Sequence, residues 1–308
     1  MRLFDDAALR KLEQLTLSAD SVRAGVMKGN RRSRKRGTSI EFADYRNYTQ
    51  GDDLRRLDWN VFARLERPFI KLTQEEEDLA VHILVDSSDS MNWPPAEDDH
   101  DAPDHKLRLA MQLAGALGYI GLLSGDLVSV TLFDSGGRRN WGPFRGRPNG
   151  WPLISFLEVN FRLLTNETAG GERRTTLDLS LRDYALRARR PGLLFLISDL
   201  LSPGDVRQGL DALLSRGYEI VLLHVLSPGE LSPDLSGDLR LLDVETGEAA
   251  EVTLDPLTLD EYATQLAQWR EQIETFCGGR GIHYSLVATD TPWELLIAQG
   301  LRRQGVVR

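Results

Sequence analysis

Four oxygen-bearing side chains stand at points where buried strands are expected to end. Asp86 closes a run of apolar and β-branched residues and is followed by Ser88 and Ser90, and Asp199 closes a second apolar run. The carboxyl ends of parallel strands share one edge of an open α/β sheet, where such sheets bind ligands. Carboxylates and hydroxyls are hard donors that suit Mg²⁺ or Mn²⁺. We therefore predict a divalent-metal site at this edge.

A threonine adds to the predicted donor set. The loop before the helix expected at Leu177 opens at the same edge and presents Thr175 and Thr176. Hydroxyls are neutral, weak ligands, so a metal held by them would stay electrophilic and would bind a carboxylate supplied from outside. Asp and Ser are also common in turns and caps. The metal interpretation therefore depends on the strand context and on the second strand that ends in Asp199.

The elements that must position these side chains alternate along the chain. Apolar periodicity from residue 79 to residue 226 predicts the order strand, helix, strand, helix, helix, strand, helix, strand. That alternation is typical of an α/β fold, a doubly wound, mostly parallel, Rossmann-type sheet with helices on both faces. An antiparallel hairpin is expected as an insertion at about residues 238–255, and a long helix, a strand and a closing helix follow it.

Two parts of the chain are expected to differ in organisation. Residues 75–308 would hold the sheet, and residues 1–74 would form an N-terminal extension with a short helix, a basic run and an Arg/Asp-rich segment. Within the extension, Phe69–Thr73 is predicted to form a hairpin with the strand that begins at Leu79. The basic run at 28–36 has no interleaved aromatics, which favours a solvated loop over a nucleic-acid site.

Composition limits the class of protein. The chain has 308 residues, 41% hydrophobic and 27% charged, which is typical of a globular protein. Its net charge of -9 argues against general nucleic-acid binding. The single cysteine, Cys277, excludes an intrachain disulfide and a multi-cysteine metal site. Without a signal-peptide pattern or an apolar stretch of ~20 residues, we expect a cytoplasmic protein with no membrane anchor of its own.

A metal-dependent hydrolase or phosphatase that uses the same Asp/Ser cluster is the alternative to a binding module. Such an enzyme needs a positioned general base or a cation for the leaving group. His82 and His224 lie within predicted strands, and Lys106 has no partner motif. The sequence contains no Walker-type loop and no G-x-G-x-x-G fingerprint, so nucleotide binding has no support. We therefore expect a non-enzymatic protein.

The predicted site resembles one that is known from other proteins. Asp86-x-Ser88-x-Ser90, Thr175 and Ser198-Asp199 resemble the metal-ion-dependent adhesion site (MIDAS) of von Willebrand factor A-type domains. The resemblance implies that the two serines and Thr175 bind Mg²⁺, or Mn²⁺ or Ca²⁺, directly or nearly so. It implies that the two aspartates bind the metal directly or through water.

A longer stretch carries a second resemblance. The segment RNYTQGDDLRRLDWNVFAR, followed by a strand, an acidic turn and ILVDSSDSM, resembles the DUF58 family of bacterial A-domain-like proteins. In that family Thr175 fits the T-x-L pattern better than Thr176, although the expected Gly-Gly pair stands earlier, at Gly170-Gly171. The resemblance implies a protein partner, either a MoxR-type AAA+ ATPase or its client, for which the A-like domain would be an adaptor or substrate recruiter.

Overall fold

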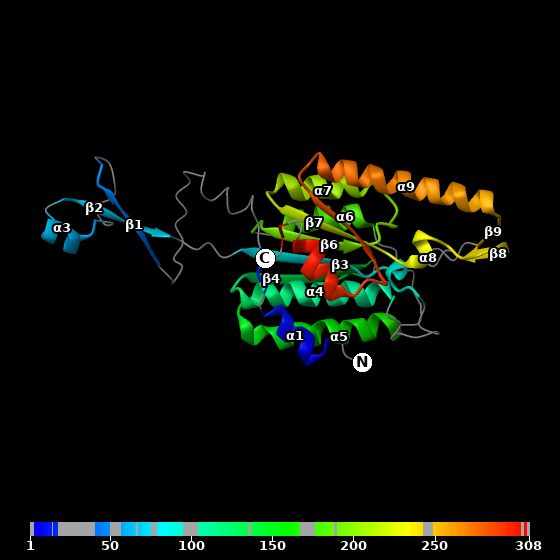
Figure 1. Ribbon diagram of the computed structural model, residues 1–308, viewed down its shortest axis with the longest axis horizontal. Helices are drawn as coiled ribbons and strands as arrows, with labels where there is room; N and C mark the ends of the chain where they lie inside the picture. Colours follow the sequence, from blue (N-terminus) through cyan, green and yellow to red (C-terminus); the bar gives the residue numbers. More distant parts are fainter. Residues whose placement is uncertain are drawn as a thin grey trace. The chain divides into compact units, whose positions relative to one another are not determined.

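The computed structural model divides the chain into two compact units (Figure 1). One unit comprises Met1–Met27 together with Leu79–Arg308, and the other comprises Lys28–Asp78. The structure describes residues 3–13, 15–17, 41–49, 57–65, 67–74, 79–94, 104–134, 137–166, 176–187, 190–242, 249–302 and 305–306. Thr175 and the basic run at 28–36 lie outside these residues.

The smaller unit contains a two-stranded sheet. Strand β1 (Glu41–Asn47) pairs antiparallel with β2 (Phe69–Gln74), and α3 (Trp59–Leu65) lies between them in the sequence. The predicted hairpin between Phe69–Thr73 and the strand that begins near Leu79 is therefore wrong. That second strand, β3 (Ala80–Asp86), is flanked on both sides by other strands of the large sheet, so it has no open edge for β2.

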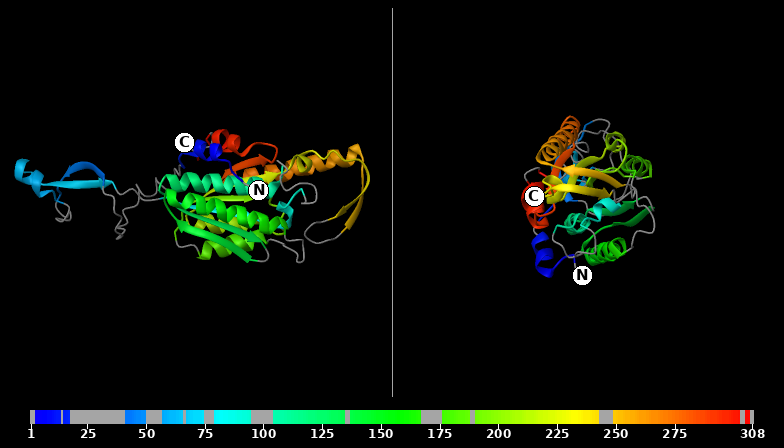
Figure 2. Two further views of the ribbon diagram at one scale, coloured as in Figure 1. Left: turned by 90° about the horizontal axis from the view of Figure 1, so that it is seen from below. Right: turned by 90° about the vertical axis from the view of Figure 1, so that its right-hand side faces the viewer.

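A six-stranded sheet forms the centre of the larger unit (Figures 1 and 2). Its order is β10-β7-β6-β3-β4-β5, and only β5 runs antiparallel. The central strands β3, β6 and β7 are buried along their whole length, as expected for a sheet covered on both faces. The predicted α/β fold with a mostly parallel sheet is confirmed. The remaining strands are β4 (Leu127–Asp134), β5 (Gly137–Phe144), β6 (Leu193–Ser198), β7 (Glu219–Leu226) and β10 (His283–Ala288).

Helices cover both faces of this sheet. Val81, Ile83 and Val85 of β3 pack into the core beneath α4 and α5, whereas Leu84 joins the core beneath α6, α7 and α9. The predicted hairpin insertion is present as β8 (Gly237–Leu242) and β9 (Ala249–Leu254). No helix within the described ranges is long and apolar enough to span a membrane. The helices are α4 (Lys106–Leu123), α5 (Gly150–Asn166), α6 (Leu177–Arg187), α7 (Val206–Ser215), α8 (Pro228–Leu231), α9 (Pro256–Gly278) and α10 (Trp293–Leu295), followed by a π-helical turn at Leu296–Leu301.

The short N-terminal helix α1 (Asp6–Leu12) belongs to the same unit as the sheet. The ring of Phe4 meets that of Trp293 edge-on at 5.2 Å. The backbone N–H of Leu3 donates to Glu158 at 2.9 Å, and the side chain of Gln112 donates to the carbonyl of Leu3 at 3.0 Å. The chain start is thus tied to α4, α5 and α10.

We expect Gly192→Ala to destabilise the fold by about 3 kcal/mol or more, because overpacking forces backbone shifts. Gly192 lies just before β6, and a Cβ there would stand 2.0 Å from the carbonyl oxygen of Ala80. A matched change is Gly278→Ala at the end of α9, where a Cβ meets nothing within 4 Å. That change should stabilise by about 0.5 kcal/mol. Urea unfolding of both variants measures these changes, and an equal loss of unfolding free energy in the two variants would contradict the prediction.

Candidate metal centre

The candidate centre lies where the strand order reverses. Strands β3 and β6 are parallel neighbours, with Val85 opposite Ile197. The chain leaves β3 for α4 on one face and leaves β6 for α7 on the other, which is the arrangement of a topological switch point. Asp86 is the last residue of β3 and Asp199 follows the last residue of β6. Both aspartates therefore stand at the same edge of the sheet, as the sequence predicted.

Asp86 is fully buried and held by two hydrogen bonds. The backbone N–H of Ser88 donates to its Oδ1 at 3.1 Å, and the hydroxyl of Ser198 donates to its Oδ2 at 2.7 Å. Burial raises the pKa of the Asp86 carboxyl to about 7, and the negative charge of Asp199 contributes in the same direction. The two hydrogen bonds act the other way but do not offset burial. The ionised carboxylate is therefore destabilised here, and either a proton or a cation would neutralise it.

The two predicted serines lie side by side. Ser88 Oγ and Ser90 Oγ are 3.0 Å apart, and both side chains are at most 9% exposed. Two ligands at neighbouring corners of an octahedron with Mg²⁺ bonds of 2.0–2.1 Å are about 2.9 Å apart. The two hydroxyls are hydrogen-bonded to each other, and their spacing is compatible with neighbouring ligand positions around one magnesium ion.

Asp199 is fully buried and engaged on both oxygens. Its Oδ2 accepts from Lys106 Nζ at 2.9 Å, and its Oδ1 accepts from the backbone N–H of Leu201 at 3.1 Å. His224 donates its Nε2–H to the carbonyl oxygen of Asp199 at 3.1 Å, since a carbonyl can only accept. Burial lowers the pKa of His224 to about 4, so this imidazole is neutral. Leu200, which follows, adopts a φ of 60°, a strained conformation for a bulky residue.

Lys106 also lies in the candidate centre, although sequence reasoning did not assign it there. Its side chain is 1% exposed, and its Nζ also contacts Glu230 Oε1 at 2.6 Å. Burial alone would lower the pKa of Lys106, but the charges of Asp199 and Glu230 outweigh burial and raise it, so the ammonium stays charged. Glu230 is fixed in turn by a capping box, in which its Oε2 accepts from the backbone N–H of Ser227 at 2.7 Å.

The donor set suits a hard divalent ion, although it is sparse in carboxylates. Among the residues that the structure describes, no three His, Cys, Asp or Glu side chains gather closely enough to hold a metal. The remaining donors would have to be hydroxyls, as the sequence predicted. Thr176 is exposed, and the backbone N–H of Leu177 next to it donates to Ser202 Oγ at 3.0 Å. The start of α6 is therefore tied to the loop that follows Asp199.

Most of this chain matches the model of a known protein family. The model of the family described as "Protein of unknown function DUF58" matches residues 44–272. The chain belongs to the DUF58 family. An uncharacterized protein of Mycobacterium tuberculosis (strain ATCC 25618 / H37Rv) is 28% identical over 306 residues, 98% of this chain and 90% of that protein. An uncharacterized protein of Mycobacterium avium is 34% identical over 119 residues, 38% of this chain and 69% of that protein.

Two solved structures are similar to this member of DUF58. An aerotolerance-related membrane protein from Bacteroides fragilis NCTC 9343, solved with multiple mutations to serines, has a TM-score of 0.43 at 16% identity, covering 73% of this chain and 99% of that chain. The conserved hypothetical protein BatB from Bacteroides thetaiotaomicron has a TM-score of 0.41 at 16% identity, covering 74% and 98%.

Proposed function

We propose that this DUF58 protein is a non-enzymatic interaction module that captures a carboxylate of a protein partner through a divalent metal ion. Asp86, Ser88, Ser90 and Asp199 would hold the ion, with Thr175 as a further ligand, in the manner of the von Willebrand factor A-type domains that the site resembles. Mg²⁺ is the first candidate, and Mn²⁺ and Ca²⁺ are alternatives. The bound ion would supply an electrophilic position, and the side chains would orient it.

The observation that carries the proposal is the excess of buried negative charge beside a matched hydroxyl pair. Asp86 and Asp199 are fully buried carboxylates, Glu230 is a carboxylate that is 24% exposed, and the ammonium of Lys106 contacts Asp199 and Glu230. When all are ionised, this group has two negative charges in excess. Buried charges are costly unless they are paired or coordinate a metal. A divalent ion beside Ser88 and Ser90 would neutralise the group.

The rim of the site supports a protein partner. Trp93 and Leu201 are 42% and 49% exposed, although both lie on loops that carry site residues. The carbonyl of Trp93 accepts from the backbone N–H of Lys106 at 2.8 Å, which fixes this loop beside the buried cluster. Exposed aromatic and aliphatic side chains next to a polar site are typical anchors of protein interfaces.

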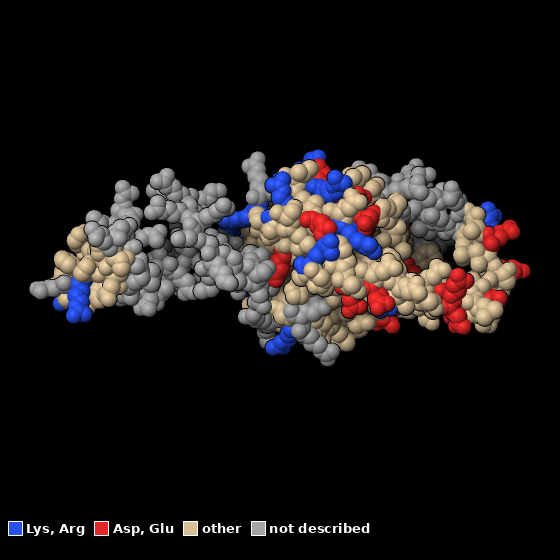
Figure 3. Space-filling view, turned by 90° about the horizontal axis from the view of Figure 1, so that it is seen from above, with Lys and Arg blue, Asp and Glu red and all other residues tan. Residues whose placement is uncertain are grey.

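The surface charge near the site indicates which charge a partner should have. Figure 3 shows acidic side chains gathered toward the end of the molecule where β8, β9 and the start of α9 lie. Exposed acidic residues there include Asp238, Glu251, Asp255 and Asp260. A partner carboxylate would be attracted by the metal and repelled by this surface, so we expect basic residues around it. A MoxR-type AAA+ ATPase or its client, which the family resemblance implies, is the proposed partner.

The first experiment tests whether the site binds a metal. It compares the double variant Ser88→Ala/Ser90→Ala with the control variant Ser87→Ala. Ser87 is a buried serine in the same loop, but its hydroxyl donates to the carbonyl of Phe133 at 3.0 Å. We expect Mg²⁺ to raise the melting temperature of wild type and Ser87→Ala, since a ligand that binds only the folded state stabilises it. The double variant should lose at least ~10-fold in Mg²⁺ affinity by calorimetric titration. Equal affinities would refute the metal site.

Partner capture is tested second. Mg²⁺-dependent pull-down of a MoxR-type AAA+ ATPase, the proposed partner, should disappear with EDTA and in the double serine variant, and should persist in Ser87→Ala. If capture persists with EDTA and in the double serine variant, partner binding does not depend on the metal. The hydrolase alternative predicts turnover of p-nitrophenyl phosphate that is abolished by Ser88→Ala. We expect no such turnover.

A further inference from the structure

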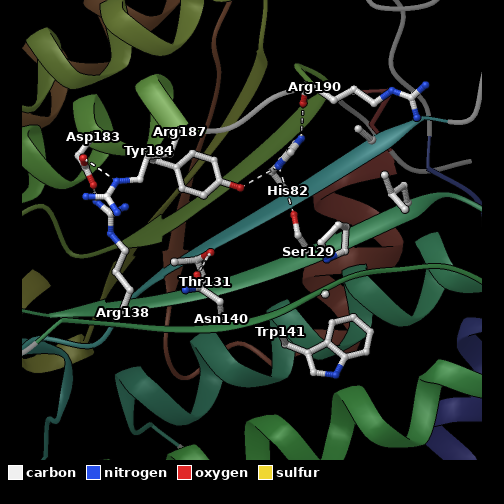
Figure 4. Close-up of a pocket in the computed structure, with 14 residues that line it drawn as sticks. His82, Ser129, Thr131, Arg138, Asn140, Trp141, Asp183, Tyr184, Arg187 and Arg190 are labelled. Atoms are coloured by element: carbon white, nitrogen blue, oxygen red, sulfur yellow. Dashed lines mark hydrogen bonds and ion pairs between the residues drawn. The ribbon is translucent and has the colours of Figure 1, made fainter.

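A pocket of about 800 Å³ lies apart from the candidate metal centre. It is bounded by α6 and by the strands β3, β4 and β5, on the face of the sheet that β3 presents through Ala80 and His82 (Figure 4). His82 stands four positions before Asp86 in β3, away from the carboxyl edge. Sites for small molecules usually have volumes of about 300–1,000 Å³ and a few convergent polar groups.

The floor of the pocket carries a connected set of polar groups. His82 donates Nε2–H to the carbonyl of Arg190 at 2.9 Å, which leaves Nδ1 to accept from the hydroxyl of Tyr184 at 2.8 Å, while the hydroxyl of Ser129 lies 3.2 Å from the same nitrogen. Burial lowers the pKa of His82 to about 4, so the ring is neutral. These hydrogen bonds hold the Tyr184 ring across the pocket, as Figure 4 shows. The floor is therefore preorganised and uncharged.

Hydrogen-bond donors line the neighbouring strands. Thr131 Oγ1 donates to the carboxamide oxygen of Asn140 at 2.9 Å. This bond uses the oxygen of Asn140 and leaves its NH₂ group to donate. Thr131 is 4% exposed and lies deep in the concave face, whereas the side chain of Asn140 is exposed and lies at its rim. A ligand that lies here would meet donors from β5 and hydroxyls from β4.

The charged groups around the pocket are mostly positive. Arg138 and Arg187 both pair with Asp183, at 2.6 Å and 2.9 Å, and Arg190 adds a third guanidinium at the opposite end of the pocket, pointing away from that pair (Figure 4). Three cations against one carboxylate leave an excess of two positive charges at this pocket, in a chain whose net charge is -9. Arg138 Nη2 also donates to the carbonyl of Ser180 at 3.0 Å, so its planar group is held in place. Guanidinium groups match the geometry of carboxylates and phosphates.

We propose that this pocket binds a small organic anion, a carboxylate or phosphate ester whose charged group lies against Arg138. Its uncharged body lies over Tyr184 and the polar side chains of β4 and β5. The polar groups converge inside a concave site, which favours a small molecule over an extended peptide. Nothing in this proposal requires the metal centre, and Asp86, Ser88 and Ser90 do not line the pocket.

The test uses the fluorescent aromatic sulfonate 1-anilinonaphthalene-8-sulfonate as the probe. Benzoate and phenyl phosphate serve as competing anions, and benzyl alcohol serves as a neutral competitor of similar size. We expect the folded full chain to bind the probe and both anions to displace it at concentrations at least tenfold lower than benzyl alcohol requires. Whichever anion displaces better identifies the preferred charged group.

Substitutions in the pocket test whether the probe binds there. Arg138→Met should weaken probe binding at least tenfold, and Thr131→Val, which keeps the shape of the side chain, should weaken it severalfold. Arg207→Met is the matched control, because Arg207 is an arginine on α7 paired with Asp205 and lies outside this pocket. Far-ultraviolet circular dichroism confirms that each variant is folded.

Two results would overturn the proposal. One is unchanged probe affinity in both Arg138→Met and Thr131→Val. The other is displacement by benzyl alcohol that equals displacement by the anions. The double serine variant of the metal centre should bind the probe like wild type, so failure here and failure of the metal proposal are distinguishable.

Discussion

Lys106→Met lowers the free energy of unfolding by about 3–5 kcal/mol, the usual loss when one member of a buried ion pair is removed. Methionine preserves most of the apolar stem, so the change mainly removes the ammonium that contacts Asp199 at 2.9 Å and Glu230 at 2.6 Å. Asp199 is fully buried, and its carboxylate would be left without a counterion. Glu230 is 24% exposed and can be partly solvated, so the loss should arise mainly at Asp199. Urea unfolding in EDTA measures the change.

A surface pair and a second substitution provide the controls. Arg207→Met removes an arginine that lies 3.7 Å from Asp205, with both side chains about half exposed, and such pairs are worth about 0–1 kcal/mol. In a double-mutant cycle, Asp199→Asn should recover a large part of the loss in Lys106→Met, because it removes the unpaired charge. If Lys106→Met lowers the free energy of unfolding no more than Arg207→Met does, the buried ion pair of Lys106 and Asp199 does not stabilise this edge of the sheet.

The same variant bears on the proposed metal. Lys106 is a cation that the chain itself supplies to Asp199, and it therefore competes electrostatically with a metal at that carboxylate. Removing it leaves more negative charge at the edge, so Lys106→Met should bind Mg²⁺ more tightly than wild type. Weaker binding would mean that the ammonium orients Asp199 for the metal rather than competing with it.

The central sheet was predictable because its strands are nearly pure runs of Leu, Ile and Val. Such runs, each followed by an amphipathic helix, fit a parallel sheet with two covered faces. From that fold it followed that Asp86 and Asp199, at the ends of two such runs, would share one edge. The pairing of β3 with β6 confirms this step.

Contacts between distant segments were not predictable in the same way. Lys106 and Glu230 are 124 positions apart, and a lysine at a helix start has no periodic signal that marks it as buried. The predicted pairing of β2 with β3 was wrong for a related reason. The alternation of Phe69–Gln74 suits any antiparallel partner, and only the lack of an open edge on β3 excludes the one that the sequence suggested. The pocket proposed to bind an anion likewise depends on α6 lying over β4, which no local pattern encodes.

Asp86 makes stability depend on pH in a direction opposite to that of most aspartates. An unfolded aspartate titrates near pH 3.9, whereas burial and the charge of Asp199 raise the pKa of Asp86 to about 7. Between these values the folded state holds a proton that the unfolded state has lost. The contribution of this group is therefore fully present below about pH 4, decreases by about 1.4 kcal/mol per pH unit, and levels off above about pH 7.

Asp86→Asn isolates this effect because the amide cannot ionise. Without metal, we expect the variant to gain stability relative to wild type as pH rises from 4 to 7, by a total on the order of 4 kcal/mol, with no further gain above. Saturating Mg²⁺ should reverse the ranking at pH 8, because the charged carboxylate binds the ion more tightly than the neutral amide does. Since proton and metal compete for Asp86, wild-type Mg²⁺ affinity should rise about tenfold per pH unit up to pH 7. A stability difference that does not change with pH would place the Asp86 carboxylate in contact with solvent or a fixed cation, and the charge imbalance that motivates a metal would be lost.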